Sequence, residues 1–118
     1  MTKADFFMDT SFGLCGFKIK NHSGYANAGQ DIVCAAISAN TDFVMSLLEE
    51  SFKVEIEVGI NQKAAEVCCN IPLSDNNVAK KDTVNLILDG FYRKLCELSQ
   101  QYPQNICCKI IRKEGLSC

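Results

Sequence analysis

Apolar and polar residues alternate along several segments of the chain, as they do in β-strands with one buried face. Residues 5–9 and 15–20 are separated by a short turn-like stretch, which predicts a hairpin. Residues 54–60 alternate cleanly, and a second alternating run over residues 67–71 ends before a proline, so a second hairpin is predicted there. Residues 106–112 are expected to form a final strand.

Two longer segments repeat their apolar residues with the period of a helix. The first covers residues 32–50, and the second starts near residue 84 and ends before Pro103, since the residue before a proline disfavours helix. Asp31 is a natural N-cap for the first helix, because its carboxylate can accept from the backbone N–H of residue 33 or 34. When successive residues turn by about 100°, the apolar residues on one side of the first helix are Val33, Ile37, Val44, Leu47 and Leu48.

The order of these elements predicts the fold class. Residues 23–30 show no apolar period and hold small residues between Gly24 and Gly29, which indicates a loop able to move. Residues 74–77 are expected to be a polar loop. The order β-β-α-β-β-α-β is typical of an α+β domain with a two-layer, mainly antiparallel sheet and two helices packed on one face. At 118 residues, residues 1–118 are expected to form a single domain.

Composition and charge narrow the class of function. Lys and Arg number 12 against 14 Asp and Glu, with no basic block, so no direct nucleic acid binding is expected. The longest apolar run, residues 32–37, is short for a membrane span of about 20 residues. The start of the sequence lacks the features of a signal peptide, so we expect a cytoplasmic protein whose eight cysteines are reduced. No Cys-x-x-Cys pair occurs, so no metal or cofactor is expected.

Cys34 and His22 are the candidate chemical groups. Cys34 falls in the first turn of the first predicted helix, where unpaired N–H groups and the helix dipole favour a reactive thiolate. His22 is the only histidine and ends the second predicted strand. Within reach, its imidazole could take the thiol proton and return it to a leaving amine, while N–H groups of the helix start stabilise an oxyanion.

Spacing alone favours a simpler interpretation. Buried cysteines commonly fill gaps near a core, and a single histidine beside Asn21 and Ser23 is often an ordinary surface residue. A cysteine and a histidine twelve positions apart are a weak signal by themselves. The choice between the two interpretations therefore depends on a longer pattern.

That longer pattern is HSGYANAGQDIVCAAIS, residues 22–38. It resembles the signature of the ribosomal-processing cysteine protease family, Prp, in which His-small-Gly-Tyr-Ala is followed by Gly-x-Asp-Ile-Val-Cys-Ala-Ala-x-Ser. The match is ungapped. The flanking hairpins, the second helix and the length are also similar to that family, so the resemblance extends over nearly the whole chain.

The resemblance implies a cysteine endopeptidase that removes an N-terminal extension from a large-subunit ribosomal protein. Its nucleophile falls on Cys34 and its general base on His22. Asp31 and Ser38 receive supporting roles: Asp31 caps the helix or orients the site, and Ser38 forms hydrogen bonds beside Cys34. The mobile loop over the substrate would include Ser23, Gly24, Tyr25, Ala26 and Gly29.

The resemblance also implies a homodimer. Because the family recognises paired phenylalanines followed by alanine, it further implies an apolar groove near this loop. One position departs from the family pattern. Asn21 stands where the family usually has glycine before the histidine, and Asn is the residue that next best tolerates positive φ. The backbone shape is therefore expected to survive there.

Two other classes of function are compatible with the residues alone. A non-catalytic dimeric protein could hold a peptide or a ribosomal partner with the same loop. A metal or redox protein could use the many thiols, although adjacent cysteines on a strand point to opposite faces and form no chelate by themselves.

Overall fold

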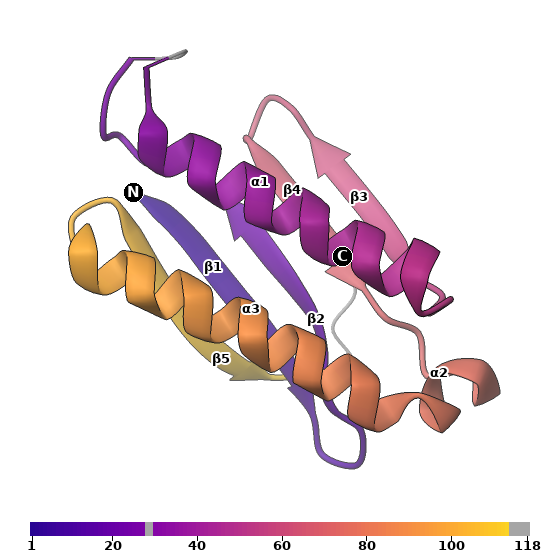
Figure 1. Cartoon of the computed structure of the whole chain (residues 1–118). Coiled ribbons are helices and arrows are strands. Elements are labelled where there is room, and N and C mark those ends of the chain that lie inside the picture. Colours follow the sequence, from indigo (N-terminus) through magenta and orange to yellow (C-terminus); the bar gives the residue numbers. More distant parts are fainter. Residues whose placement is uncertain (28–29, 114–118) are drawn as a thin grey trace.

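A five-stranded sheet forms one layer of the molecule, and two long helices lie side by side on one of its faces (Figure 1). The computed structural model describes residues 1–27 and 30–113. The strand order is β3-β4-β2-β1-β5. The strands are β1 (Thr2–Asp9), β2 (Gly13–Lys20), β3 (Glu57–Asn61), β4 (Glu66–Asn70) and β5 (Ile106–Arg112), and the helices are α1 (Ile32–Ser46), the π-helical turn η1 (Leu47–Ser51), α2 (Asp75–Ala79) and α3 (Lys81–Gln101).

The sheet is mixed but mainly antiparallel. β2 pairs antiparallel with β1 and with β4, and β3 pairs antiparallel with β4, whereas β5 pairs parallel with β1. The predicted α+β class, the two helices on one face and the predicted order of the main elements are confirmed. Both hairpins are formed, and β5 has the predicted bounds.

The apolar stripe of the first predicted helix faces the sheet. Val33, Ile37, Val44 and Leu48 are buried, and only Leu47 of the predicted stripe is half-buried. In α3 the buried residues are Val84, Leu88, Phe91 and Leu95. Phe91 packs edge-on against two rings of the sheet, with centroids 5.3 Å from Phe6 and 5.0 Å from Phe17. These contacts place both helices on one continuous core.

Three local predictions differ from the structure. The first helix ends as an α-helix at Ser46 and continues as one π-helical turn. Residues 74–77 are not a loop, because the Ser74 hydroxyl accepts from the Asn77 N–H at 3.2 Å and starts the short helix α2. The strand predicted over residues 54–60 runs instead over Glu57–Asn61 as the edge strand β3, whose residues are all exposed, with Ile60 70% exposed.

The helical segment Ile32–Ser51 is long and apolar enough to cross a membrane by length and composition. This is weak support for a span, because a core helix passes the same test. One face of this segment packs on the sheet through Val33, Ile37 and Val44. The sequence prediction considered only the apolar run over residues 32–37, whereas the whole helical segment Ile32–Ser51 is apolar on average.

Candidate active site

Four segments that are distant in the sequence meet at one end of the sheet (Figure 1): the start of β1, the end of β2, the start of α1 and the turn between α3 and β5. Thr2 joins two of the others, since its N–H donates to the Asn105 carbonyl at 2.9 Å and its hydroxyl donates to the Asn21 carbonyl at 3.0 Å. The Asn105 side chain donates to the Ser23 carbonyl at 3.1 Å. The segment that carries His22 is therefore attached to the body of the protein on both sides.

Asp31 caps α1, as the sequence predicts. Its Oδ1 accepts from the Cys34 N–H at 2.8 Å, and its Oδ2 accepts from the Ser23 hydroxyl and from the Tyr25 N–H. The Ser23 hydroxyl, followed by the backbone N–H groups of Cys34, Ala26 and Tyr25, holds the pKa of Asp31 below its usual value, against a smaller opposing effect of desolvation. One ionised carboxylate thus binds both the loop and the first turn of α1.

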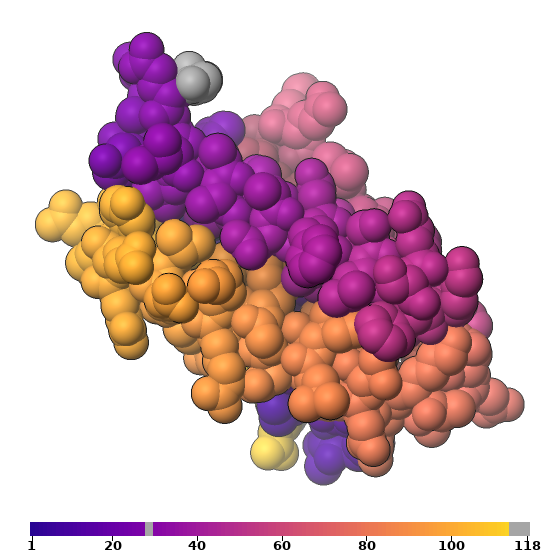
Figure 2. Space-filling model, viewed as in Figure 1, coloured from indigo at the N-terminus to yellow at the C-terminus, as the bar shows by residue number. Residues whose placement is uncertain are grey.

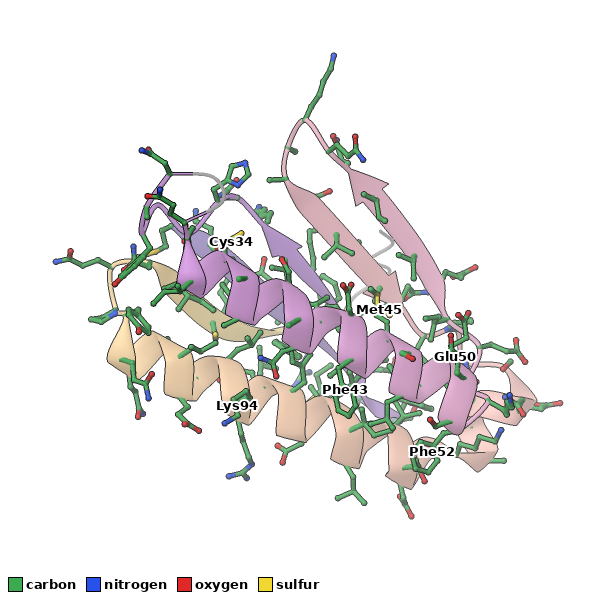
Figure 3. All side chains as sticks on the ribbon, turned by 45° about the horizontal axis from the view of Figure 1, so that its top comes forward. Cys34, Phe43, Met45, Glu50, Phe52 and Lys94 are labelled. Carbon is green, nitrogen blue, oxygen red and sulfur yellow. The ribbon has the colours of Figure 1, made fainter. Side chains whose placement is uncertain are left out.

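Cys34 lies in the first turn of α1 and is half-buried, at the edge of the buried face where the sequence placed it. Figure 3 shows its sulfur on the side of α1 that faces the β2–α1 loop and the β3–β4 hairpin. Its backbone N–H is used by Asp31. Within the described residues, the N–H groups of Ile32 and Val33 at the helix start have no hydrogen-bond acceptor.

His22 follows directly on a residue with positive φ. Asn21 has φ 72°, and its N–H donates to the Ala65 carbonyl at 3.0 Å. Asn21 thus adopts positive φ, a conformation that Asn tolerates better than most residues other than glycine. His22 itself is exposed, and within residues 1–27 and 30–113 its imidazole makes no hydrogen bond to the Cys34 thiol. The two residues are connected through Ser23 and Asp31.

A groove of about 370 Å³ lies between α1 and the turn that joins β3 to β4. Its α1 side uses the helix face that carries Cys34: at about 100° per residue, Thr41 and Met45 lie within about 20° of Cys34, and Ser38 lies within about 40°. Figure 3 shows Met45 on the same side of α1 as Cys34. The remaining lining residues are Thr2, Ile19, Asn21, Ile37, Asp42, Ile60, Asn61, Gln62, Ala65, Glu66 and Val67.

The groove reaches the end of the sheet near the candidate residues through Thr2 and Asn21, but its lining among the described residues includes neither Cys34 nor His22. In Figure 2 the β2–α1 loop and the β3–β4 turn project on either side of a notch above α1. Asn21, which precedes His22, and Ser38, one turn after Cys34, both line the groove. In the described residues the Ser38 hydroxyl makes no hydrogen bond, so its supporting role beside Cys34 stays a prediction.

The first part of the predicted mobile loop is anchored. Ser23 is only 1% exposed, and the Tyr25 ring packs edge-on against Tyr102 at a centroid distance of 5.5 Å. Gly24 has φ 73°, the left-handed conformation that glycine adopts at no steric cost. Ala26 is exposed, and Gly29 lies outside the described residues. Loop movement stays a prediction, and Ser23 and Tyr25 are the residues of this loop that contact other segments in the described part of the chain.

Sequence reasoning missed the residues that anchor this loop from a distance. Thr2, Tyr102 and Asn105 belong to no motif, and they reach the site through the pairing of β1 with β5. The only sequence signal was their polar character near the ends of predicted strands and helices, which is common in any protein. Their role becomes visible only when the topology brings the strand ends together.

The other described thiols differ from Cys34 in their surroundings. Desolvation raises the pKa of Cys69 to about 12 and is the largest cause that raises the pKa of Cys108 to about 12, with Cys96 adding to the latter. Cys107 is exposed. Over residues 1–27 and 30–113, no group of three or more His, Cys, Asp or Glu side chains is arranged to hold a metal ion.

The arrangement described above matches a known family. The family model described as Cysteine protease Prp matches residues 1–107. The chain belongs to this family. Membership makes it a cysteine protease and confirms the resemblance seen in the sequence. A comparison with curated proteins finds no match.

Crystal structures of family members and related proteins share the fold. The ribosomal processing protease Prp from S. aureus, in complex with a covalently linked product peptide, is 19% identical with a TM-score of 0.82, covering 94% of this chain and 100% of that one. The same protease with a substrate peptide gives a TM-score of 0.75 at 19% identity, with the same coverage. A Streptococcus mutans protein is 21% identical, with a TM-score of 0.79 and 96% of each chain covered.

Proposed function

We propose that the chain is an endopeptidase of ribosomal protein processing, which removes the N-terminal extension of a large-subunit ribosomal protein with Cys34 as nucleophile and His22 as general base. The observation that carries this proposal is the groove, which follows the Cys34 face of α1 and ends beside the residue that precedes His22. The S. aureus relative, a ribosomal processing protease that holds a product or substrate peptide, supports the substrate class.

In the proposed reaction, the His22 imidazole takes the proton of the Cys34 thiol, and the thiolate attacks the carbonyl carbon of the scissile peptide bond. The tetrahedral intermediate collapses when the imidazolium gives its proton to the leaving amine, which leaves a thioester on Cys34. Water, deprotonated by His22, then attacks the thioester and releases the new carboxyl end. The thiol is regenerated, and no cofactor or metal enters the reaction.

The backbone geometry limits which groups can stabilise the oxyanion. The Cys34 N–H already donates to the Asp31 carboxylate, so it is occupied in the free protein. The Ile32 and Val33 N–H groups lack acceptors in the described part of the chain and are the better candidates. Donors fixed by a helix start need no reorganisation when charge develops on the carbonyl oxygen.

The Asp31 carboxylate makes a histidine partner necessary. A negative N-cap already occupies the positive end of the α1 dipole, and a second negative charge on Cys34 would lie in the same turn. An imidazolium at His22, formed when the imidazole takes the thiol proton, would balance this charge. Both carboxylate oxygens of Asp31 are engaged by Ser23, Tyr25 and Cys34, which supports a capping role and argues against direct orientation of the imidazole.

The groove fits a peptide with apolar side chains. Ile19, Ile37, Met45 and Val67 provide apolar surface, and Ser38 and Asn61 offer polar groups for a peptide backbone. This chemistry agrees with a cleavage sequence of paired phenylalanines followed by alanine. Ser38, without a partner in the described residues, is assigned to bind the peptide rather than Cys34.

A homodimeric state in the cytoplasm, without a direct nucleic acid or membrane partner, belongs to the same proposal. Sedimentation velocity over a range of protein concentrations checks the dimer. A species with the mass of a single chain throughout that range would contradict this part and leave the chemistry unaffected.

The experiment that tests the function is incubation of the purified protein with the precursor ribosomal protein, followed by mass measurement of the products. We expect one cut after the extension, and Cys34→Ala should lower the rate by roughly three orders of magnitude or more while the circular dichroism spectrum is unchanged. A precursor with both phenylalanines replaced by aspartate is the substrate control and should stay intact. Cleavage by Cys34→Ala near the wild-type rate would refute the assignment.

A further inference from the structure

We propose that Ser23, Asn105 and Thr2 are positioning residues, which hold the backbone on both sides of His22 and thereby fix its imidazole relative to Cys34. The inference rests on the proposed function, because it treats His22 as the base for Cys34. It is carried by hydrogen bonds that join the two neighbours of His22 to three other segments of the protein.

The residue after His22 is held at two atoms. Ser23 is 1% exposed although its neighbours in the loop are exposed. Its carbonyl accepts from the Asn105 side chain at 3.1 Å, and its hydroxyl donates to the Asp31 carboxylate. Since that carboxylate also binds the Cys34 N–H at 2.8 Å, Ser23 fixes the His22 segment directly to the turn that carries the thiol.

The residue before His22 is also held at two atoms. The Asn21 carbonyl accepts from the Thr2 hydroxyl at 3.0 Å, and Thr2 is itself 1% exposed. The Asn21 N–H donates to the Ala65 carbonyl at 3.0 Å, in the turn that also lines the groove. The chain on this side is thus joined to the start of β1 and to the groove wall.

Asn105 can hold Ser23 in place because its own backbone is fixed. Its N–H donates to the Tyr102 carbonyl and its carbonyl accepts from the Thr2 N–H, both at 2.9 Å. The three positioning residues therefore form one connected set across β1, the β2–α1 loop and the α3–β5 turn. A movement of any one of them would displace His22, and a shift of about 1 Å can cost roughly 100-fold in rate.

The exposed state of His22 is what makes this set important. In the described residues no side chain holds the imidazole, so its position depends on the backbone at Asn21 and Ser23. A loop that only connects β2 to α1 would not need buried side chains such as Ser23 and Thr2 to hold its backbone. The two residues give the loop a fixed base while residues beyond Ser23 stay exposed.

The test is the alkylation rate of Cys34 by iodoacetamide, measured by peptide mass spectrometry between about pH 6 and pH 9, a range that includes the ordinary pKa values of histidines and thiols. Ser23→Ala is compared in the wild-type and His22→Ala backgrounds. With His22 present, we expect Ser23→Ala to lower the Cys34 rate roughly tenfold and to change its pH profile. In the His22→Ala background the same substitution should have a much smaller effect, because the group it positions is gone and only the Ser23–Asp31 hydrogen bond beside the Cys34 turn is lost.

Asn105→Ala should reproduce the Ser23→Ala result. The matched controls are Ser74→Ala, which removes the cap of α2, and Asn85→Ala, which removes side-chain hydrogen bonds to Leu14 and Phe12 at the other end of β2. Both controls lose comparable hydrogen bonds and should leave the Cys34 rate unchanged. Three results would each overturn the proposal. Ser23→Ala could lower the alkylation rate of Cys34 equally in both backgrounds, or in neither. The His22→Ala variant could also alkylate at the wild-type rate.

Alkylation does not depend on peptide cleavage, so this test separates the positioning role from the proposed function. If the protein fails to cut the precursor but its Cys34 alkylation depends on His22 as expected, the positioning role is supported and the proposed substrate is refuted. A protein that cuts the precursor, but whose Cys34 alkylation rate is unchanged by Ser23→Ala in both backgrounds, loses the positioning set only. In an active enzyme, Ser23→Ala should lower kcat and leave KM nearly unchanged.

Discussion

The two ends of β2 have similar backbone features, but only one of them lies at the candidate active site. At the Gly13 end the chain has φ 94°, and at the other end Asn21 has φ 72°. Each end is also held by an asparagine side chain from a distant segment: Asn85 bonds to the Leu14 N–H and the Phe12 carbonyl at 2.8 Å, and Asn105 bonds to the Ser23 carbonyl. The same device therefore occurs at a turn and at the candidate active site.

The difference lies in what surrounds the turning residue. At the first end a Cβ on Gly13 would meet the Asn85 Oδ1 at 2.2 Å, and Phe12 is buried, so the turn is closed around the core. At the second end the backbone is also held by hydrogen bonds, but the side chain of His22 is exposed and its neighbour Asn21 lines a groove. Substitutions should therefore change stability at the Gly13 end and chemistry at the Asn21 end.

The largest expected effect is at His22. His22→Ala should lower kcat by roughly 10²- to 10⁴-fold, because proton transfer to and from the sulfur loses its partner. The free energy of unfolding should stay within about 0.5 kcal/mol of wild type, since the side chain is exposed and without hydrogen bonds in the described residues. Precursor cleavage and urea denaturation measure the two quantities, with Gln100→Ala on the exposed side of α3 as the control. A large loss of stability with little loss of kcat in His22→Ala would contradict the expectation that this end of β2 serves chemistry rather than stability.

The opposite pattern is expected at Gly13. Gly13→Ala should lower the free energy of unfolding by about 1–3 kcal/mol, because it combines positive φ with a close approach to Asn85. The cleavage rate per folded molecule should be unchanged. Gly90→Ala is the matched control: it lies inside α3 with open space around it, and the substitution should stabilise the protein by up to about 1 kcal/mol. Equal stability of both variants would show that the turn is not constrained.

The smallest effect is expected at Asn21. Asn21→Gly restores the residue usual in the family pattern, and both residues accept the observed φ, so the cleavage rate should change by less than about threefold. Asn21→Ala is the control and should lose more stability, because alanine is strained at positive φ. A gain above about tenfold in Asn21→Gly would mean that Asn21 restrains the site, and the two ends of β2 would then be less alike than their backbones indicate.

The sequence predicts the layers of the fold and the local surroundings of Cys34, because both depend on short-range patterns. The stripe from Val33 to Leu48 sets which face of α1 is buried, and the Asp31 cap follows from one side chain and one N–H group three positions away. The cap of α2 by Ser74 uses the same chemistry and was missed because the helix is only five residues long.

The groove and the anchoring of the loop could not be predicted in this way. Both depend on the pairing of strands, which brings Thr2 beside Ile106 and β4 beside β2. Asn105 and Ser23 are 82 positions apart, and no local pattern connects them. The exposure of Ile60 has a similar cause, because it reflects the place of β3 at the edge of the sheet.

The most direct test of the central claim is the rate at which iodoacetamide labels Cys34 compared with Cys107 in the same protein near neutral pH. Cys107 is exposed and serves as an internal reference for an accessible thiol. If Cys34 is paired with His22 as an ionised nucleophile, it should be labelled at least roughly tenfold faster than Cys107 although it is half-buried. Labelling of Cys34 at the same rate as Cys107, or more slowly, would contradict the assignment of Cys34 and His22 as the catalytic pair.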